Sequence, residues 1–248
     1  MAAMLSTLDY TIRRSPTPLG EPQADWDSAA WAGAETLSVA LWPWAPGTAR
    51  HVEAHTAHLP KVEARLMWTA DYLALMFRVE DRYVRAVAGH PWNGTDSVCT
   101  DSCVEFFVSP VAGSDAYLNC EVNPGGTMLI EAHDGIIPEG IGDEKPTIHS
   151  SIPMATTMPP NIDPEIEDPT TWCVEYHLPN ALFVKYFGPD AAIGGAGYRA
   201  NFYKCADQTS HPHWGCWSPV ETPQPSFHQP KYFRPLKFDE ATAAPGRL

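Results

Sequence analysis

Alternating apolar and polar positions in two neighbouring segments, residues 98–108 (VCTDSCVEFFV) and 117–123 (YLNCEVN), give the clearest structural signal in the chain. Successive side chains of a β-strand point to opposite faces, so each segment would have one apolar face and one polar face. The two segments are joined by SPVAGSDA, a link of hairpin length. If they pair, one face of the sheet carries Glu105, Asn119, Glu121 and Asn123.

Further runs of β-branched, aromatic and alternating residues predict more short strands. These runs are residues 8–13, 37–44, 62–68, 72–81, 128–133, 172–178, 198–205 and 236–238. Residues 180–187 fit a short helical segment, and residues 83–100 and 134–170 are predicted to be mainly loop. Many short strands with turn residues between them predict an all-β fold, an antiparallel β-sandwich of jelly-roll or immunoglobulin-like type.

The amino-acid composition supports this fold class and predicts that long loops connect the strands. The 248 residues include 25 prolines and 17 glycines, which favour turns over long helices. The length suits one large all-β domain, and no internal boundary divides it. We therefore expect an irregular N-terminal leader over residues 1–25 and a single β-sandwich domain with long Pro/Gly-rich loops over residues 26–248.

The formal net charge of −14 narrows the classes of partner. Nucleic acid and anionic membranes require a basic surface, so neither is expected to bind. No apolar run approaches the roughly 18 residues of a membrane span. A neutral ligand, or a cation such as Ca²⁺, fits this charge better.

The N-terminus and the cysteines indicate in which cellular compartment the protein is expected. The first twenty residues lack the apolar core of a signal peptide, which predicts a cytoplasmic protein, or a periplasmic or secreted one if a leader has been removed. The six cysteines have no CxxC spacing and most lie in strand-like runs, so we expect buried free thiols. The sequence leaves the oligomeric state open.

Two later strands extend the polar face if they join the same sheet. Residues 172–178 would add Glu175 and His177, and residues 198–205 would add Arg199 and Asn201. Aromatic residues in loops could flank this face: Trp92, Trp214, Trp217 and Phe227. Carboxylates, amides and Arg hydrogen-bond to sugar hydroxyls, while aromatic rings cover the apolar faces of a pyranose. The face is therefore either a site for a hydroxyl-rich ligand or ordinary solvated surface.

The ordered segments LMWTADYLALMFRVED, VCTDSCVEFFVSP, YLNCEVNPGGT, WCVEYHLP, YRANFYKC, WSP and PSFHQPKYFRPLKF carry a family resemblance. Together they resemble the family 9 carbohydrate-binding modules, and more closely the bacterial family-9-like proteins of the DOMON-like superfamily. The resemblance runs from about residue 60 to residue 238. It implies a β-sandwich that binds sugars, often beside bound Ca²⁺.

The resemblance also implies site residues. In the sugar-binding members, two tryptophans sandwich a terminal sugar while a Glu and other polar groups hold its hydroxyls. By motif, that Glu falls on Glu105, and the second aromatic falls on Phe227 with His228 beside it. The first tryptophan falls on Cys99, which has no stacking face, so Trp92 or Trp217 would have to complete the sandwich.

Metal sites are weaker predictions. Acidic residues near the loops could ligate Ca²⁺. They are Glu80, Asp81, Asp96 and Asp101. His211 and His213, followed by Cys216, could instead bind a transition metal.

We therefore predict non-catalytic binding of a mono- or oligosaccharide. The expected hydrogen-bonding residues are Glu105, Asn119, Glu121, Arg199 and Asn201, with Asn123, Glu175 and His228 close by. The first alternative is a glycoside-processing enzyme that uses two of the Glu carboxylates. The second is a module whose polar face binds another protein.

Overall fold

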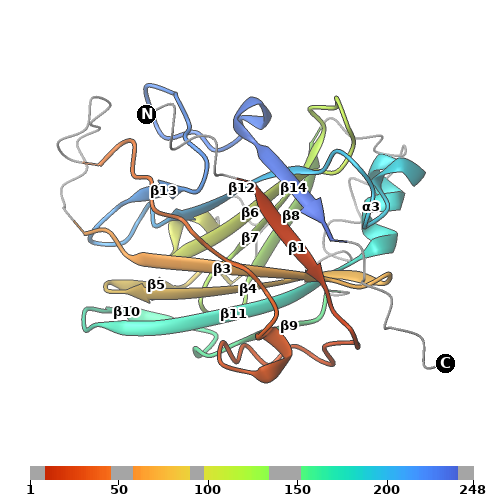
Figure 1. Cartoon of the computed structure of the whole chain (residues 1–248). Helices are drawn as coiled ribbons and strands as arrows, with labels where there is room; N and C mark the ends of the chain where they lie inside the picture. Colours follow the sequence, from red (N-terminus) through yellow and green to blue (C-terminus); the bar gives the residue numbers. More distant parts are fainter. Residues whose placement is uncertain (1–8, 46–57, 90–97, 134–151, 240–248) are drawn as a thin grey trace.

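The computed structural model describes residues 9–45, 58–89, 98–133 and 152–239 (Figure 1). Nearly all of its regular structure is β-strand. The strands are β1 (Tyr10–Arg14), β2 (Thr36–Ser38), β3 (Lys61–Trp68), β4 (Tyr72–Asp81), β5 (Val84–Ala86), β6 (Cys103–Ser109), β7 (Tyr117–Val122), β8 (Met128–His133), β9 (Met154–Thr156), β10 (Ile162–Ile166), β11 (Thr170–Pro179), β12 (Arg199–Cys205), β13 (Trp214–Cys216) and β14 (Arg234–Phe238). The helix α3 spans Asn180–Phe187, and the 3-10 turns include η1 (Ala29–Trp31) and η2 (Val98–Thr100).

The strands form a curled sheet whose two halves face each other as a β-sandwich (Figure 1). One layer has the order β8-β7-β6-β12, with β13 also paired to β12. The other has the order β3-β4-β11-β9, with β2 also paired to β3. Strands β14 and β1 connect the layers, and β1 pairs in parallel with both β14 and β3. The remaining pairs are antiparallel, as predicted, and β5 and β10 form a small separate sheet.

The core lies between the two layers. Leu66 and Phe77 from the second layer and Phe106 and Phe202 from the first are fully buried in one cluster. The rings of Phe77 and Phe202 lie 6.1 Å apart, so β4 and β12 contact each other across the sandwich. Apolar residues alternate along these strands, so burying the apolar face of each layer leaves the other face free to carry a site.

Most predicted elements are confirmed. The prediction for 72–81 matches β4, that for 128–133 matches β8, and that for 180–187 matches α3. The predicted strand over residues 37–44 is wrong in length: only β2 and an isolated bridge at Leu41 form.

The two predicted loop regions are only partly loop. Residues 83–100 contain β5, and residues 134–170 contain β9 and β10. These strands are three to five residues long, too short for a period-two pattern to reveal them. The predicted extended piece at residues 8–13 corresponds to β1, which joins part of the expected leader to the sheet.

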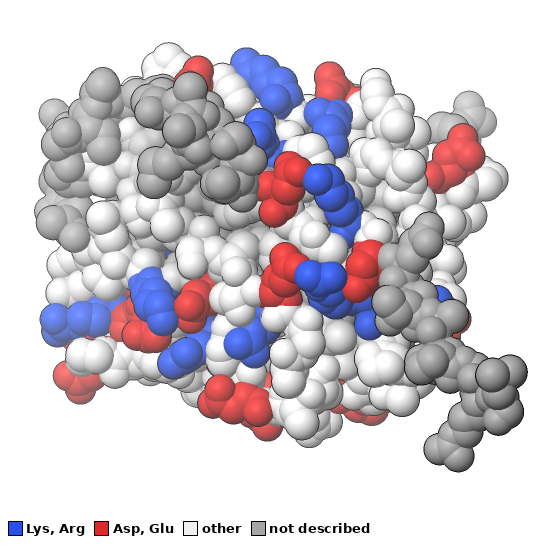
Figure 2. Space-filling view, viewed as in Figure 1, with Lys and Arg blue, Asp and Glu red and all other residues white. Residues whose placement is uncertain are grey.

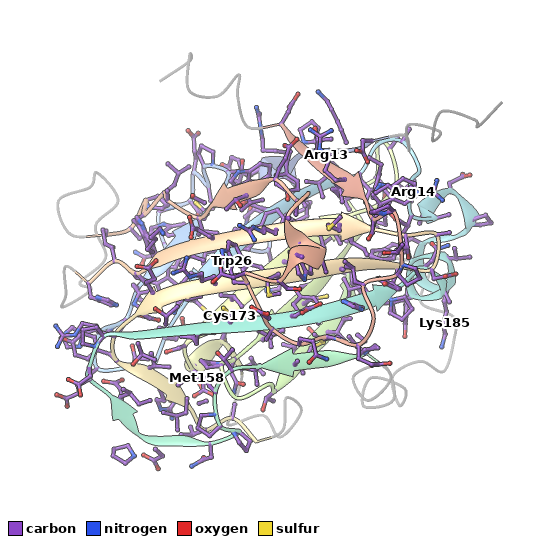
Figure 3. The ribbon with its side chains drawn as sticks, turned by 60° about the horizontal axis from the view of Figure 1, so that its bottom comes forward. Arg13, Arg14, Trp26, Met158, Cys173 and Lys185 are labelled. Atoms are coloured by element: carbon purple, nitrogen blue, oxygen red, sulfur yellow. The ribbon has the colours of Figure 1, made fainter. Side chains whose placement is uncertain are left out.

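The N-terminal segment covers the outer face of the second layer. Trp26 and Trp31 pack there with Met76 and Cys173, and the guanidinium of Arg65 lies 3.9 Å from the centre of the Trp26 ring. Figure 3 shows Trp26 over these strands, with Cys173 on β11. Each face of this layer is therefore occupied by protein.

Charged side chains are interspersed on the face that carries β3 and β4 (Figure 2). There Lys61 lies 3.1 Å from both Glu63 and Glu80. Exposed pairs of this kind contribute little to stability. None of the helices in the described part of the chain is long and apolar enough to cross a membrane.

Candidate functional site

A pocket of about 240 Å³ opens on the side of the first layer that faces away from the core. Its floor comes from β6, β7 and β12, and its walls come from η2 and the segment after β12. The lining residues are Cys99, Glu105, Glu121, Cys205, Asp207, Trp214, Pro225, Ser226, Phe227 and His228.

The strand register explains why two glutamates meet in the floor. Glu105 of β6 pairs directly with Glu121 of β7, and Tyr203 of β12 pairs with Glu105 on the other side. Directly opposed side chains in antiparallel strands have Cβ atoms about 4.5–5.5 Å apart. The predicted division of β6 and β7 into an apolar face and a polar face is confirmed, because Phe106 and Cys120 lie in the core.

This polar face is buried rather than solvated. Glu105 is 2% exposed and Glu121 is 5% exposed. The segment after β13 covers part of the face: the ring of Phe227 stacks on Tyr203 at 4.2 Å, and the Tyr203 hydroxyl donates to the Phe227 carbonyl at 3.1 Å. The pocket is the part of the face that this segment leaves open.

Aromatic and polar groups stand around the mouth of the pocket. The indole nitrogen of Trp214 donates to Asp207 at 2.7 Å, which fixes the orientation of that ring. The Tyr117 hydroxyl lies 2.7 Å from Nδ1 of His228 and holds the imidazole at the rim. Burial lowers the pKa of His228, with a further contribution from the nearby His133. The rim therefore presents hydrogen-bonding groups beside two aromatic rings.

The two floor carboxyls are electrostatically linked. Burial and the neighbouring Glu121 raise the pKa of Glu105 well above its usual value. Burial also raises the pKa of Glu121 to about 7, although a hydrogen bond from Asn119 opposes this. Asn119 donates to Oε1 of Glu121 at 3.0 Å, while Oε2 is buried with no hydrogen-bond partner among the described residues. Such an oxygen is costly unless a ligand or solvent donates to it.

The raised pKa of Glu121 predicts how stability depends on pH. Between the usual Glu pKa of 4.5 and about 7, the folded protein binds more protons than the unfolded chain, so unfolding free energy falls as pH rises. The expected loss is ~3 kcal/mol for such a shift. Urea denaturation at pH 5 and pH 8 should show this loss in the wild type. The loss should be smaller in Glu121→Gln, because of the two floor carboxyls only Glu105 then keeps a raised pKa. The exposed control Glu167→Gln should lose as much stability as the wild type. An equal loss in Glu121→Gln would contradict the assignment of part of this loss to Glu121.

Several predicted binding residues lie away from the pocket opening. Asn201 hydrogen-bonds to backbone groups of Phe202 and Ser218. Arg199 donates to the carbonyls of Ser114 and Pro230, at the far end of β12. These contacts are those of residues that hold loops in place.

The remaining predicted residues have other surroundings. Trp217 is packed in the core against Phe202, 5.5 Å between ring centroids. Asn123 donates to Asp101 at 2.9 Å rather than entering the pocket. Asn119 does not line the pocket but donates a hydrogen bond to Glu121, which does. Trp92 lies outside the described residues.

Glu175 does not join this polar face, because β11 belongs to the other layer. Its Oε2 accepts hydrogen bonds from the backbone N–H groups of Gln23 and Ala24, each at 3.0 Å. His177 lies 3.0 Å from its Oε1. Glu175 and His177 thus anchor the N-terminal segment. They were expected beside Glu105 only if residues 172–178 joined the same layer, and β11 does not.

The carboxylates predicted for calcium do not fit that ion. Asp101 accepts from Arg85 at 2.7 Å and from the backbone N–H groups of Val87 and Ala88. Asp81 lies 2.7 Å from His58 and 3.4 Å from the ammonium of Lys204. Each carboxylate already faces a protein cation, which would repel a bound Ca²⁺. The exposed Glu80 pairs with Lys61, and Asp96 lies outside the described residues.

The histidines considered for a transition metal are also engaged. The Nε2 atom of His213 lies 3.0 Å from the Lys204 ammonium, and the ring of His211 stacks on Tyr83. Cys216 is buried in an apolar cluster with Tyr203 and Phe227.

Sequence reasoning missed some of the lining residues. Cys205 shares the polar face with Tyr203 because the two lie two positions apart on β12, and Asp207 continues the same spacing beyond the strand end. Extending the alternation past Tyr203 would have found both. Pro225 and Ser226 lie in a loop with no periodic signal.

Comparisons with known proteins concern the family and the fold of the chain. The model of carbohydrate-binding family 9 matches residues 49–238. The chain is similar to a candidate carbohydrate-binding protein from Bacteroides uniformis, with 26% sequence identity and a TM-score of 0.75 over 93% of this chain and 99% of that chain. No curated protein sequence matches the chain.

Two further structures share the fold at 14% sequence identity. Both are of a family 9 carbohydrate binding module from Caldicellulosiruptor kristjanssonii. Its complex with cellotriose has a TM-score of 0.58 and covers 97% of this chain and 100% of that chain. Its complex with glucose has a TM-score of 0.57 and covers 96% of this chain and 100% of that chain.

Proposed function

This chain belongs to carbohydrate-binding family 9, and we propose that its pocket binds the terminal ring of a glucose-type sugar without cleaving it. The membership confirms the resemblance inferred from the sequence. Four positions that the resemblance pointed to line the one pocket described above: Cys99, Glu105, Phe227 and His228.

The observation that carries the proposal is the unsatisfied carboxyl oxygen in the pocket floor. Oε2 of Glu121 is buried without a hydrogen-bond partner among the described residues, directly beside Glu105. A pair of vicinal hydroxyls could donate to the two carboxyls at once. A hydrogen bond contributes about 0.5–1.5 kcal/mol net, and several together suit recognition of a neutral polyol.

The walls support the same ligand class. Phe227 and Trp214 offer apolar ring surface to the C–H face of a pyranose, while His228 and Ser226 offer polar atoms at the rim. The volume of about 240 Å³ is below the roughly 300–1,000 Å³ of pockets for drug-sized ligands. One ring would enter, and the rest of an oligosaccharide would extend outward.

The placement of the carboxyls favours holding a sugar over hydrolysing it. The two carboxylates of a glycosidase flank the scissile bond from either side. Here both belong to adjacent strands of one floor and pair directly in the register. They can hydrogen-bond to neighbouring hydroxyls, but a glycosidic bond would not lie between them.

Isothermal titration of the full chain with glucose and cellotriose tests the proposal. We expect both to bind, with cellotriose at least as tight because it contributes the same terminal ring. Glucitol is the matched control, since it keeps the hydroxyls but lacks the ring. No heat from either sugar, or equal binding of glucitol, would contradict a ring-binding pocket.

Replacing Phe227 tests the stacking wall. Phe227→Leu keeps an apolar side chain but removes the flat ring, so we expect glucose affinity to fall about 2- to 12-fold, the equivalent of 0.5–1.5 kcal/mol. The measurement is again titration calorimetry.

A matched control is Phe238→Leu, since Phe238 contacts Trp68 and Tyr198 away from the pocket. Its affinity should equal that of the wild type. An equal loss in both variants would assign the effect to general packing rather than to stacking on the sugar.

A further inference from the structure

Three side chains able to bind a metal converge at the pocket floor. Cys103 of β6 pairs directly with Cys205 of β12, and Glu105 lies two residues beyond Cys103 on the same face. One ligand atom from each of them lies within 4.8 Å of the other two. The Cys205 thiol already donates to Oε1 of Glu105 at 3.0 Å.

This set of donors matches the preferences of zinc. Zn²⁺ binds thiolates and carboxylates in tetrahedral geometry, and soft thiolate sulfur excludes Ca²⁺ and Mg²⁺. Sites with three protein ligands keep a fourth position for water or another ligand. Cys205 and Glu105 line the pocket, so the fourth position would open into it.

The site also has a rigid frame and an entry route. All three residues lie on paired central strands rather than in loops, which holds their spacing. Cys103 and Cys205 are free thiols, 0% and 1% exposed. The pocket leads to Cys205 and is bordered by Glu105, Glu121 and Asp207, and no Lys or Arg is among the lining residues in the described part of the chain. An incoming cation therefore meets acidic groups without repulsion from a lining Lys or Arg.

We propose that Cys103, Cys205 and Glu105 form a zinc site in the pocket floor. On binding, the two thiols and the protonated fraction of the Glu105 carboxyl release their protons to solvent. The thiolate sulfurs and a carboxylate oxygen then coordinate the ion, with no change of oxidation state. Because the metal must displace these protons, its affinity rises with pH. The proposal concerns the metal alone and does not depend on sugar binding.

The test is titration of the full chain with Co²⁺ and Zn²⁺ under reducing conditions and without sugar. Cobalt bound to thiolates gives sulfur-to-metal charge-transfer absorption in the near ultraviolet. We expect this absorption to saturate at one ion per chain and to disappear when Zn²⁺ is added. The Cys103→Ser/Cys205→Ser variant should lose it, while Cys173→Ser should keep it, because Cys173 is a buried thiol on the outer face of the other layer.

X-ray absorption on the wild-type zinc protein keeps the test independent of how the variants fold. Two sulfur ligands at about 2.3 Å would support the site. A shell of nitrogen and oxygen only, or cobalt charge-transfer absorption that survives in the double Ser variant, would overturn it. Absence of that absorption in the wild type would also overturn it, whether or not the protein binds glucose.

Discussion

Glu105→Gln should weaken glucose binding by roughly 5- to 150-fold, the equivalent of about 1–3 kcal/mol for leaving one buried sugar hydroxyl without its acceptor. The carboxyl lies at the floor of the pocket beside Glu121, and both are nearly fully buried. The amide of Gln has the same shape, but it replaces one acceptor oxygen with a nitrogen that can only donate. Titration calorimetry at neutral pH measures the loss.

The same substitution should leave the fold intact. Burial and the neighbouring Glu121 raise the pKa of Glu105, so ionising it in the folded protein is unfavourable, and Gln removes that cost. We expect an unchanged or slightly higher melting temperature at neutral pH. The control Glu221→Gln changes an exposed carboxylate outside the pocket lining and should affect neither quantity. A variant that binds glucose normally would show that Glu105 is part of the scaffold only.

The polar floor could be predicted from the sequence because local periodicity determines it. In β6 and β7 every second residue is apolar, and a hairpin-length link joins the strands, so the pairing of Glu105 with Glu121 follows from local rules. The resemblance to family 9 added His228 and gave Phe227, already named as a loop aromatic, its stacking role; both lie in a loop without periodicity.

Long-range pairing could not be predicted in the same way. The alternation in β11 is as clear as in β6, yet β11 pairs with β4 and β9, which places Glu175 in the other layer. Alternation tells which residues share a face of one strand, but not which sheet the strand joins. For the same reason the sequence did not reveal that Phe227 stacks on Tyr203 and covers part of the polar face.

Lys204 is the sharpest departure from a simple apolar core. It follows Ala200 and Phe202 at every second position of β12, so its side chain enters the space between the layers and is 0% exposed. Its ammonium lies 3.4 Å from Asp81 of β4 and 3.0 Å from Nε2 of His213. Burial and the charge of Lys204 lower the pKa of His213 to about 3, so the neutral imidazole accepts from the ammonium.

Lys204→Met should lower the unfolding free energy by about 3–5 kcal/mol, because it leaves the buried carboxylate of Asp81 without its cation. Burial alone would raise the pKa of Asp81, but Lys204 and the hydrogen bond with His58 outweigh it and hold the pKa below its usual 3.8. The contribution is therefore fully present above that pH and is lost as the pH falls further. Urea denaturation at pH 7 measures it.

A second substitution separates the lost ion pair from lost packing. Lys204→Met/Asp81→Leu removes both charges, and apolar replacement of a buried pair is often neutral or stabilising, so much of the stability should return. The exposed control Lys61→Met should change the unfolding free energy by no more than about 0.5 kcal/mol. A double variant less stable than Lys204→Met would contradict this explanation. The stability lost in Lys204→Met would then come from packing around β12 and not from an unpaired Asp81 carboxylate.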